Sequence, residues 1–312
     1  MSDAVADFHP CPVLPGCPDC AREPKPTGHI SEKERGHPAR MAEKGGTPNL
    51  PSGSALATCE PLSVRWPFVD AVYCISLRER PERTQSAADR LHALGLCGRT
   101  TFHRPTKPAT GPTGVAIWES HRAAARHALA CGARTALILE DDFVIARPRS
   151  AESRTNAAFQ RLPPGWNALF LGHWPLSGYF TAPGLLKTRS GCAHAYILNR
   201  PLLEWLDAFP IPDRMLHPLV GKGIDAAYAS FDGMYALFPM IAVQSGSPSD
   251  CINARFYRSG RPRPLTNKFR YRDFVIHRCM RPAEWLCAIL SPLHWTCERL
   301  GLNTGVQPRD FR

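Results

Sequence analysis

Short apolar runs alternate with amphipathic stretches in the first half of the chain, after about residue 66. VDAVYCISL (69–77), TTFHRP (100–105) and ARTALILED (133–141) have strand length. Thr84–Leu94 and Val115–Ala130 place apolar residues at helical spacing between them. The order of strand and helix predicts an α/β domain, and ARTALILED, apolar on both faces, predicts a buried parallel strand.

The pattern continues further along the chain with both kinds of element. Pro201–Phe209 predicts a helix opened by its proline, and GIDAAYASF (223–231) predicts one or two helical turns. RERPER (78–83), residues 105–114 and residues 173–190 are expected to be loops. Three further runs of strand length are WNALFLG (166–172), AHAYILN (193–199) and MYALFPMIAVQS (234–245).

The two ends of the chain differ from this middle part. Residues 1–62 are rich in Pro, Gly, Ser and charge, without a sustained apolar period, which predicts a disordered extension. A folded domain, expected to be the catalytic one, spans residues 63–255, and a basic, partly helical tail follows at 256–312. Met41 is an alternative start, in which case residues 1–40 are no part of the protein.

Cysteine and histidine gather in the N-terminal extension, where CPDC (17–20) has the two-residue gap of many zinc knuckles. No second half-site follows at regular spacing, so disordered coil is favoured over a zinc site. The other cysteines are scattered, several of them inside apolar runs. We therefore expect the twelve cysteines of the chain to be mostly free thiols.

Composition limits the class of protein. Of 312 residues, 44% are hydrophobic and 21% are charged, which is enough for a substantial globular core. The sequence shows neither a secretory signal nor an uninterrupted apolar run of membrane-spanning length, so a cytoplasmic location is expected. The net charge is +11, and residues 251–312 hold twelve Lys or Arg against four Asp or Glu. Without a motif for it, binding to a specific nucleic acid is not expected.

Three consecutive carboxylates, Glu140, Asp141 and Asp142, end the buried strand in TALILEDDFVI. Ligands bind at the carboxyl ends of strands in open α/β sheets, and alternation points Glu140 and Asp142 to one side. Their repulsion calls for a cation, and hard oxygen ligands suit Mg²⁺ or Mn²⁺. The alternative is that the acids cap the next turn or pair with Arg147 and Arg149.

An ordered series of motifs resembles glycosyltransferase family 25, which includes bacterial lipopolysaccharide and lipooligosaccharide galactosyltransferases. The resemblance spans roughly residues 68 to 253, with the acidic strand as its most specific part. The sequence departs from the family in GVAIWESH, which lacks a Gly-Cys pair, and at Ser76, where Asn is common. The motifs are AVYCISLRERPERT (71–84), SHRAAARHAL (120–129), TALILEDDFVI (135–145), WNALFLG, AHAYILNR and GIDAAY.

This resemblance implies a GT-A-like, Rossmann-type mixed sheet flanked by helices, with a nucleotide-sugar donor at the sheet edge. It implies a metal-assisted hexosyltransferase that uses a UDP-sugar, with UDP-galactose expected, and that inverts the anomeric centre. The metal, Mn²⁺ or Mg²⁺, is expected on Asp142 with Asp141, beside Glu140. Ser76, Glu140, Asp141 and the arginines of the first loop are expected to bind the donor. The arginines are Arg78, Arg80 and Arg83, whose guanidinium forks suit phosphate.

Inversion needs a base that deprotonates the acceptor hydroxyl. Asp225 resembles the family's later aspartate and is the first candidate, with Asp232 and Glu119 as alternatives. His121 faces inward on its predicted helix and is expected to pack or to form a hydrogen bond rather than to react.

The tail, residues 269–300, mixes arginines with apolar residues. Pro282 begins a pattern with Trp285, Leu286, Ile289, Leu290 and Leu293 on one side, interrupted by Pro292. Such a helix suits either the inner face of a membrane, where a lipid-linked glycan is the acceptor, or packing on the domain. A non-catalytic protein that binds membrane or polyanion through this tail is the alternative to the enzyme.

Overall fold

The computed structural model describes residues 8–12, 66–109, 113–209, 223–245 and 281–302. Its centre is a seven-stranded mixed sheet in the order β1-β3-β2-β4-β7-β6-β8. A second sheet consists of two strands, β5 (Phe143–Ile145) and β9 (Ala242–Gln244). The strands of the large sheet are β1 (Phe8–Pro10), β2 (Ala71–Ile75), β3 (Thr100–His103), β4 (Thr135–Glu140), β6 (Ala168–Ala182), β7 (Leu185–Asn199) and β8 (Met234–Leu237).

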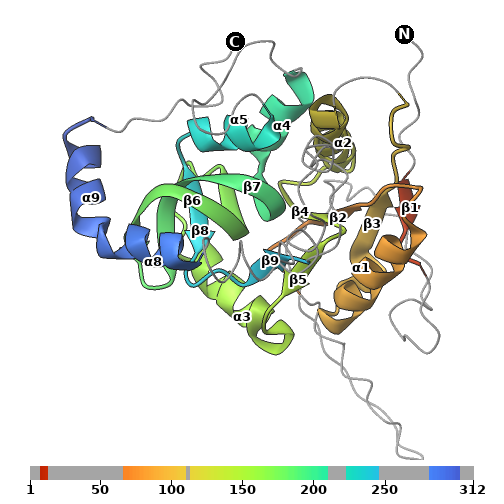
Figure 1. The fold of residues 1–312 in the computed structure, drawn as a ribbon, viewed down its shortest axis with the longest axis horizontal. Coiled ribbons are helices and arrows are strands. Elements are labelled where there is room, and N and C mark those ends of the chain that lie inside the picture. The colour runs from red at the N-terminus through yellow and green to blue at the C-terminus, as the bar shows by residue number, and fades with distance from the viewer. Residues whose placement is uncertain (1–7, 13–65, 110–112, 210–222, 246–280, 303–312) are drawn as a thin grey trace, which may run out of the picture. The chain divides into compact units, whose positions relative to one another are not determined.

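Helices cover both faces of the large sheet, so the fold is the mixed α/β architecture that the sequence predicts (Figure 1). One core packs α1 (Pro81–Ala93) and α3 (Pro148–Phe159) against one face. The other core packs three helices against the opposite face, and these are α2 (Thr113–Ala130), α4 (Arg200–Ala208) and α5 (Ile224–Ser230). Two C-terminal helices follow, α8 (Arg281–Ile289) and α9 (Ser291–Arg299).

The first half of the chain builds a switch point in the sheet. β2 pairs in parallel with β3 on one side and with β4 on the other, so α1 and α2 cross to opposite faces. In the register of β2 and β4, Ile75 lies opposite Glu140 at the carboxyl ends of both strands. This is the place where open α/β sheets bind ligands.

β4 is buried as predicted, but only one of its two neighbours is parallel. β7 runs antiparallel to it, with Leu139 opposite Ala195. Strand order within the second half of the chain is a tertiary property, which the apolar run alone does not encode.

Several local expectations from the sequence are wrong. RERPER is not entirely a loop, because Pro81 begins α1, where its missing N–H costs no hydrogen bond. Most of residues 173–190 belong to the long β6–β7 hairpin rather than to a loop. MYALFPMIAVQS forms two strands, β8 and β9, instead of one.

The N-terminal segment that we expected to be coil throughout contributes an edge strand. β1 pairs antiparallel with β3, and the ring of Phe8 stacks on His103 with centroids 4.9 Å apart. A strand of three residues is too short to show a period, so the sequence gives no warning of it. The CPDC motif, Met41 and the tail segment 256–280 lie outside the described residues.

Two further expectations can be compared with the described part of the chain. The seven cysteines described there are all free thiols, as predicted: Cys11, Cys74, Cys97, Cys131, Cys192, Cys287 and Cys297. Among the described helices, none has both the length and the apolar character needed to cross a bilayer.

Candidate functional site

The carboxylates that follow β4 are held in place by residues from β2 and α1. Asp141 is buried, its backbone N–H donates to Ile75 O, and its Oδ2 accepts a 2.9 Å hydrogen bond from Ser76 Oγ. Its Oδ1 forms an ion pair with Nη2 of Arg83, from the first turn of α1. Asp141 is therefore engaged on both oxygens by the protein itself.

Asp142 is placed differently. Its Oδ2 lies 3.5 Å from Arg83 Nη2, and only 12% of its side chain is exposed. Its Oδ1 is buried without a hydrogen-bond partner in the described structure. Burial, together with the neighbouring carboxylate of Glu140, raises the pKa of Asp142 to about 8. A bound cation or a proton would satisfy this oxygen.

Glu140 and Asp225 complete a group of carboxylates that influence one another. Desolvation, followed by the charge of Asp225, raises the pKa of Glu140. Asp225 stands in the first turn of α5, and its Oδ1 accepts a 2.7 Å hydrogen bond from the backbone N–H of Ala193 on β7. Burial raises the pKa of Asp225, while this hydrogen bond and His121 act in the opposite direction. Strand β4 and helix α5, far apart in sequence, thus place their acids within electrostatic reach.

His121 joins Glu140 to the core. Its Nε2 lies 3.3 Å from Glu140 Oε1, and its Nδ1 lies 2.5 Å from the hydroxyl of Tyr196 on β7. The Tyr228 hydroxyl donates to Tyr196 at 3.3 Å. Complete burial lowers the pKa of His121 to about 4, so the imidazole is neutral near pH 7. This agrees with the packing and hydrogen-bonding role expected from the sequence.

Arg90 is a site residue that the sequence analysis did not single out. Its Nη1 donates to the backbone carbonyl of Asp141 at 3.1 Å, and its Nη2 donates to Ser86 Oγ at 2.7 Å. Arg83, Ser86 and Arg90 stand three and four residues apart, which puts them on one face of α1. That spacing is the signal that could have identified Arg90.

Cys192 and His194 of β7 are also close to the acids and were not predicted. Cys192 has φ of 71°, uncommon for a residue other than glycine, and its Sγ lies 3.3 Å from His194 Nδ1. Burial and then the charges of Asp225, Glu140 and Asp142 raise the pKa of this thiol well above its usual range. The sequence could not reveal these neighbours because the register of β7 against β4 was unknown.

The structure places the predicted donor-binding residues in different surroundings. Ser76 is 1% exposed, and its hydroxyl contacts the protein interior. Ser76 Oγ donates to Asp141 and lies 2.8 Å from Thr84 Oγ1. Arg83 contacts the acids. Arg80 lies 3.6 Å from Glu82, and Arg78 is exposed on the loop after β2. The ion pairs of the acids recorded in the described structure go to Arg83 and not to Arg147 or Arg149.

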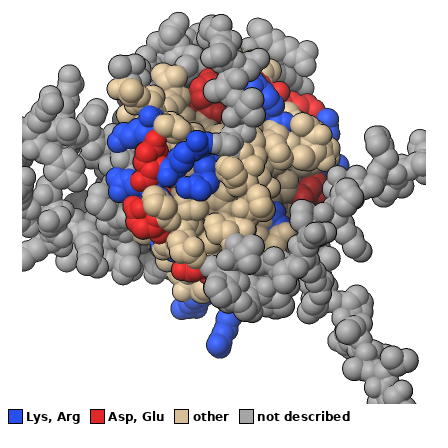
Figure 2. Space-filling model, turned by 90° about the vertical axis from the view of Figure 1, so that its right-hand side faces the viewer, with Lys and Arg blue, Asp and Glu red and all other residues tan. Residues whose placement is uncertain are grey.

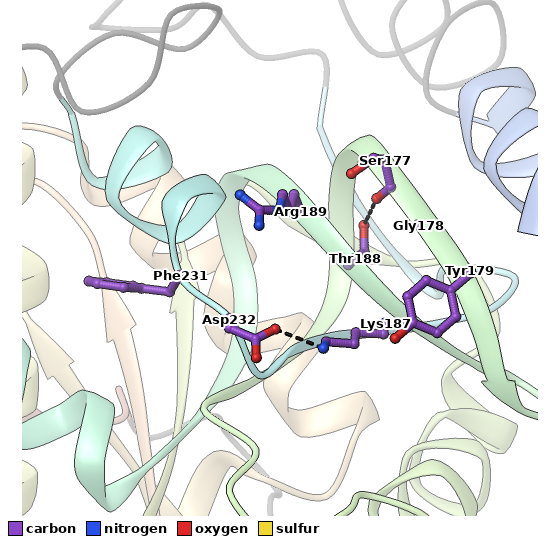
Figure 3. Close-up of a pocket in the computed structure, with 8 residues that line it drawn as sticks. All are labelled: Ser177, Gly178, Tyr179, Lys187, Thr188, Arg189, Phe231 and Asp232. Atoms are coloured by element: carbon purple, nitrogen blue, oxygen red, sulfur yellow. Dashed lines mark hydrogen bonds and ion pairs between the residues drawn. The ribbon is translucent and has the colours of Figure 1, made fainter. Parts of the chain in front are cut away.

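The two alternative bases have salt-bridge partners of their own. Glu119 lies 3.4 Å from Arg122 and is 48% exposed. Asp232 lies 2.8 Å from Lys187 Nζ, at one side of a small pocket on the β6–β7 hairpin (Figure 3). The empty space of this pocket, open solvent included, is about 260 Å³, and none of the acids around Glu140 lines it. Its remaining lining residues are Ser177, Gly178, Tyr179, Thr188, Arg189 and Phe231.

The residues after β4 partly fit a divalent metal. Asp142 offers a buried oxygen without a partner, and carboxylates are the hard ligands that Mg²⁺ and Mn²⁺ prefer. In the described part of the chain, no group of three or more His, Cys, Asp or Glu is arranged to hold a metal ion by itself. A metal here would depend on substrate phosphate and water for most of its ligands, which is usual for Mg²⁺.

No family model matches the chain, and neither does any curated protein. Solved structures resemble parts of the fold at TM-scores of 0.30 to 0.34, too low to assign a function. A197 from STIV is 16% identical (TM-score 0.30), with 54% of this chain and 81% of that chain covered. A glycosyltransferase involved in glycosylation of the major capsid of PBCV-1 is 9% identical (TM-score 0.31; 44% and 64% covered). UDP-glucose pyrophosphorylase complexed with UDP-glucose is 12% identical (TM-score 0.34; 60% and 78% covered).

Proposed function

We propose that the protein is a glycosyltransferase that moves a sugar from a UDP-sugar, with galactose as the expected sugar, to a glycan or lipid-linked glycan. The observation that carries the proposal is the gathering of Glu140, Asp142 and Asp225 at the carboxyl ends of β2 and β4. Raised carboxylate pKa values at a sheet switch point are typical of functional sites. The motif resemblance to family 25 supports the same reaction.

Each residue then has a role that follows from its surroundings. Asp142 is the metal ligand, since its Oδ1 has no other partner in the described structure, with Glu140 beside it. Asp141, which we expected to share the metal, instead fixes the turn through Ser76 and Arg83. A divalent cation bound at Asp142 would neutralise the charge that develops on the UDP leaving group.

Asp225 is the proposed base. The N–H of Ala193 orients one of its oxygens, and burial raises the pKa of the Asp225 carboxyl above its usual range, which makes it a stronger base. Among the three candidates, Asp225 is the one that lies within electrostatic reach of Glu140. Arg78 and Arg80, which follow β2 at the same sheet end, are proposed to contact the diphosphate.

Release of UDP from individual UDP-sugars in the presence of Mn²⁺ tests the proposal. The wild-type protein should release UDP, chelation of the metal should stop the release, and Asp142→Ala should slow it at least about a hundredfold. Asp207→Ala is the matched control, because Asp207 pairs with Arg126 on the surface of α4. The proposal fails if no UDP-sugar is hydrolysed and Asp142→Ala changes neither UDP binding nor Mn²⁺ binding.

A further inference from the structure

Large apolar side chains are exposed along the two C-terminal helices. Of the ten large hydrophobic residues exposed in the described structure, eight lie on α8, on α9 or just after it. Their exposure runs from 38% for Leu290 to 73% for Leu302. We call them the apolar tail face: Trp285, Leu286, Ile289, Leu290, Leu293, Trp295, Leu300 and Leu302. Exposed apolar side chains gathered in this number on neighbouring helices are typical of an interaction site.

The orientation of α8 is the reverse of an ordinary amphipathic helix. The side turned to the protein carries Glu284, which is fully buried, and Cys287, which is 7% exposed. Glu284 Oε1 accepts a 2.8 Å hydrogen bond from Met240 N and lies 3.3 Å from His173 Nε2. A charged residue is rarely buried unless it is paired. These contacts fix the rotation of α8 about its axis and so leave Trp285, Leu286 and Ile289 exposed to solvent.

The apolar tail face is fastened to the β6–β7 hairpin on a second side. Ser291 Oγ accepts a 2.5 Å hydrogen bond from the N–H of Phe180, near the tip of the hairpin. The ring of Phe238 packs edge-on against both Phe180 and Trp285, at centroid distances of 4.8 and 4.9 Å. The helices thus pack on the domain, as one sequence interpretation expected, while their apolar residues remain exposed.

Charge indicates what covers this face. The chain carries a net charge of +11, of which +8 comes from residues 251–312. Arg281 and Arg299 of α8 and α9 are balanced by Glu284 and Glu298, so this excess lies in the sequence on either side of the two helices. Arg299 also lies over the ring of Trp295, 4.6 Å from its centroid. By contrast, Lys and Arg side chains alternate with Asp and Glu on the surface visible in Figure 2. Two copies of so basic a segment would repel each other, whereas an anionic surface attracts it.

We propose that the apolar tail face docks on the surface of an anionic lipid bilayer. Tryptophan prefers the boundary between headgroups and acyl chains, and leucine and isoleucine enter it when a helix lies in the plane of the membrane. Basic residues beside such a helix add attraction to anionic lipids. This docking is independent of the proposed transferase activity and can be tested without a substrate.

Flotation of the full chain with vesicles tests the docking. The wild-type protein should float with phosphatidylcholine vesicles that contain phosphatidylglycerol and much less with phosphatidylcholine alone, and high salt should weaken the binding. Replacing three exposed residues (Leu286→Gln, Ile289→Gln and Leu293→Gln) should weaken vesicle binding by roughly tenfold or more. Val115→Gln, at the exposed apolar residue of α2, should bind like the wild type.

Three results would overturn the proposal. The first is that the wild-type chain does not bind anionic vesicles, and the second is that the triple variant binds them as well as the wild type does. The third is that the wild type is a dimer and the triple variant a monomer, while neither binds vesicles. The last result would assign the face to a second copy of the chain. Circular dichroism melting of the triple variant shows that it remains folded, which is expected because all three side chains are exposed.

Discussion

Asp141 and Asp142 are adjacent carboxylates with different surroundings, and the difference lies in which protein atoms reach each of them. Ser76 and Arg83 engage the two oxygens of Asp141, so its charge is compensated inside the protein. Asp142 shares Arg83 at the longer distance of 3.5 Å and keeps one buried oxygen without a partner. The single guanidinium therefore leaves Asp142 with too little positive charge nearby, which contributes to its raised pKa and makes it the carboxyl that an external cation would ionise.

Replacing the Arg83 guanidinium should change how the site binds a cation and an anion. In Arg83→Gln, Mn²⁺ alone should bind several-fold more tightly, because a positive charge next to the cation site is lost. UDP without metal should bind more weakly for the same reason. Isothermal titration calorimetry measures both affinities, and Arg200→Gln, which removes an arginine from an exposed pair with Glu204, should change neither. Weaker Mn²⁺ binding in Arg83→Gln, with its fold intact, would contradict this account of the site.

Part of the site could be predicted at the level of single residues. The acids after an apolar run implied a sheet-edge site, and the side of the strand on which Glu140 and Asp142 lie follows from alternation. The different contacts of Asp141 and Asp142 could not be predicted, because they depend on where the first turn of α1 places Arg83. His194 and Tyr196 were missed because their closeness depends on the register of β7.

The β6–β7 hairpin shows how one residue allows two elements to approach. Gly172 ends the WNALFLG motif, and a Cβ built on it would lie 2.3 Å from the carbonyl oxygen of Ala242 on β9 and 2.3 Å from His194 Nε2. Ala242 cannot retreat easily, since the neighbouring Ile241 N donates to Leu171 O at 2.9 Å, and the His194 ring is fully buried. The glycine is required for space, not for an unusual backbone angle.

Gly172→Ala should therefore destabilise the protein by about 1 to 3 kcal/mol, the usual cost of forcing a methyl group into a packed core. Urea unfolding followed by circular dichroism measures the change in the free energy of unfolding. Gly114→Ala is the control, because a Cβ at Gly114, in the first turn of α2, meets no atom within 4 Å. Equal unfolding free energies for the two variants would show that β9 does not approach Gly172 as described.

Elements with one clear period were predictable, and those shaped by tertiary contacts were not. The helices now seen as α1, α2 and α4 and the three parallel strands were predicted from apolar spacing. The outer half of the β6–β7 hairpin was not, because residues 173–190 contain Pro, Gly, Ser and Thr, which are also typical of loops. Strand pairing over the whole hairpin outweighs that local preference.

On the scale of the whole molecule, buried neutral histidines make stability depend on pH. His103 is 4% exposed, its Nδ1 has no hydrogen-bond partner in the described structure, and burial lowers its pKa to about 4. The groups facing it are the ring of Phe8 and, electrostatically, His121 and His127 of α2. The unfolded chain takes up a proton near the ordinary histidine pKa of about 6.5, so stability is complete above that pH and is lost as the pH falls toward 4.

The contribution of His103 to the free energy of unfolding should consequently fall by roughly 1 to 2 kcal/mol between pH 7.5 and pH 5, while the raised pKa values of Glu140 and Asp142 act in the opposite direction. His103→Gln should lose less stability than the wild type over the same interval. His92→Gln, at an exposed position of α1, should keep the wild-type dependence. Urea unfolding at the two pH values measures this, and parallel losses in wild type and His103→Gln would refute the assignment.

The anchor of the tail and the proposed base are supported by neighbouring positions of one strand. Ser190 Oγ lies 3.0 Å from His173 Nδ1, whose other ring nitrogen faces Glu284 of α8, while Ala193 N holds Asp225. Three residues of strand span on the order of 10 Å. A protein that rests on a bilayer by α8 would thus hold its proposed reaction centre in a fixed orientation to the membrane, because one strand positions both. The distance between an acceptor sugar and its lipid would then decide whether that sugar reaches Asp225.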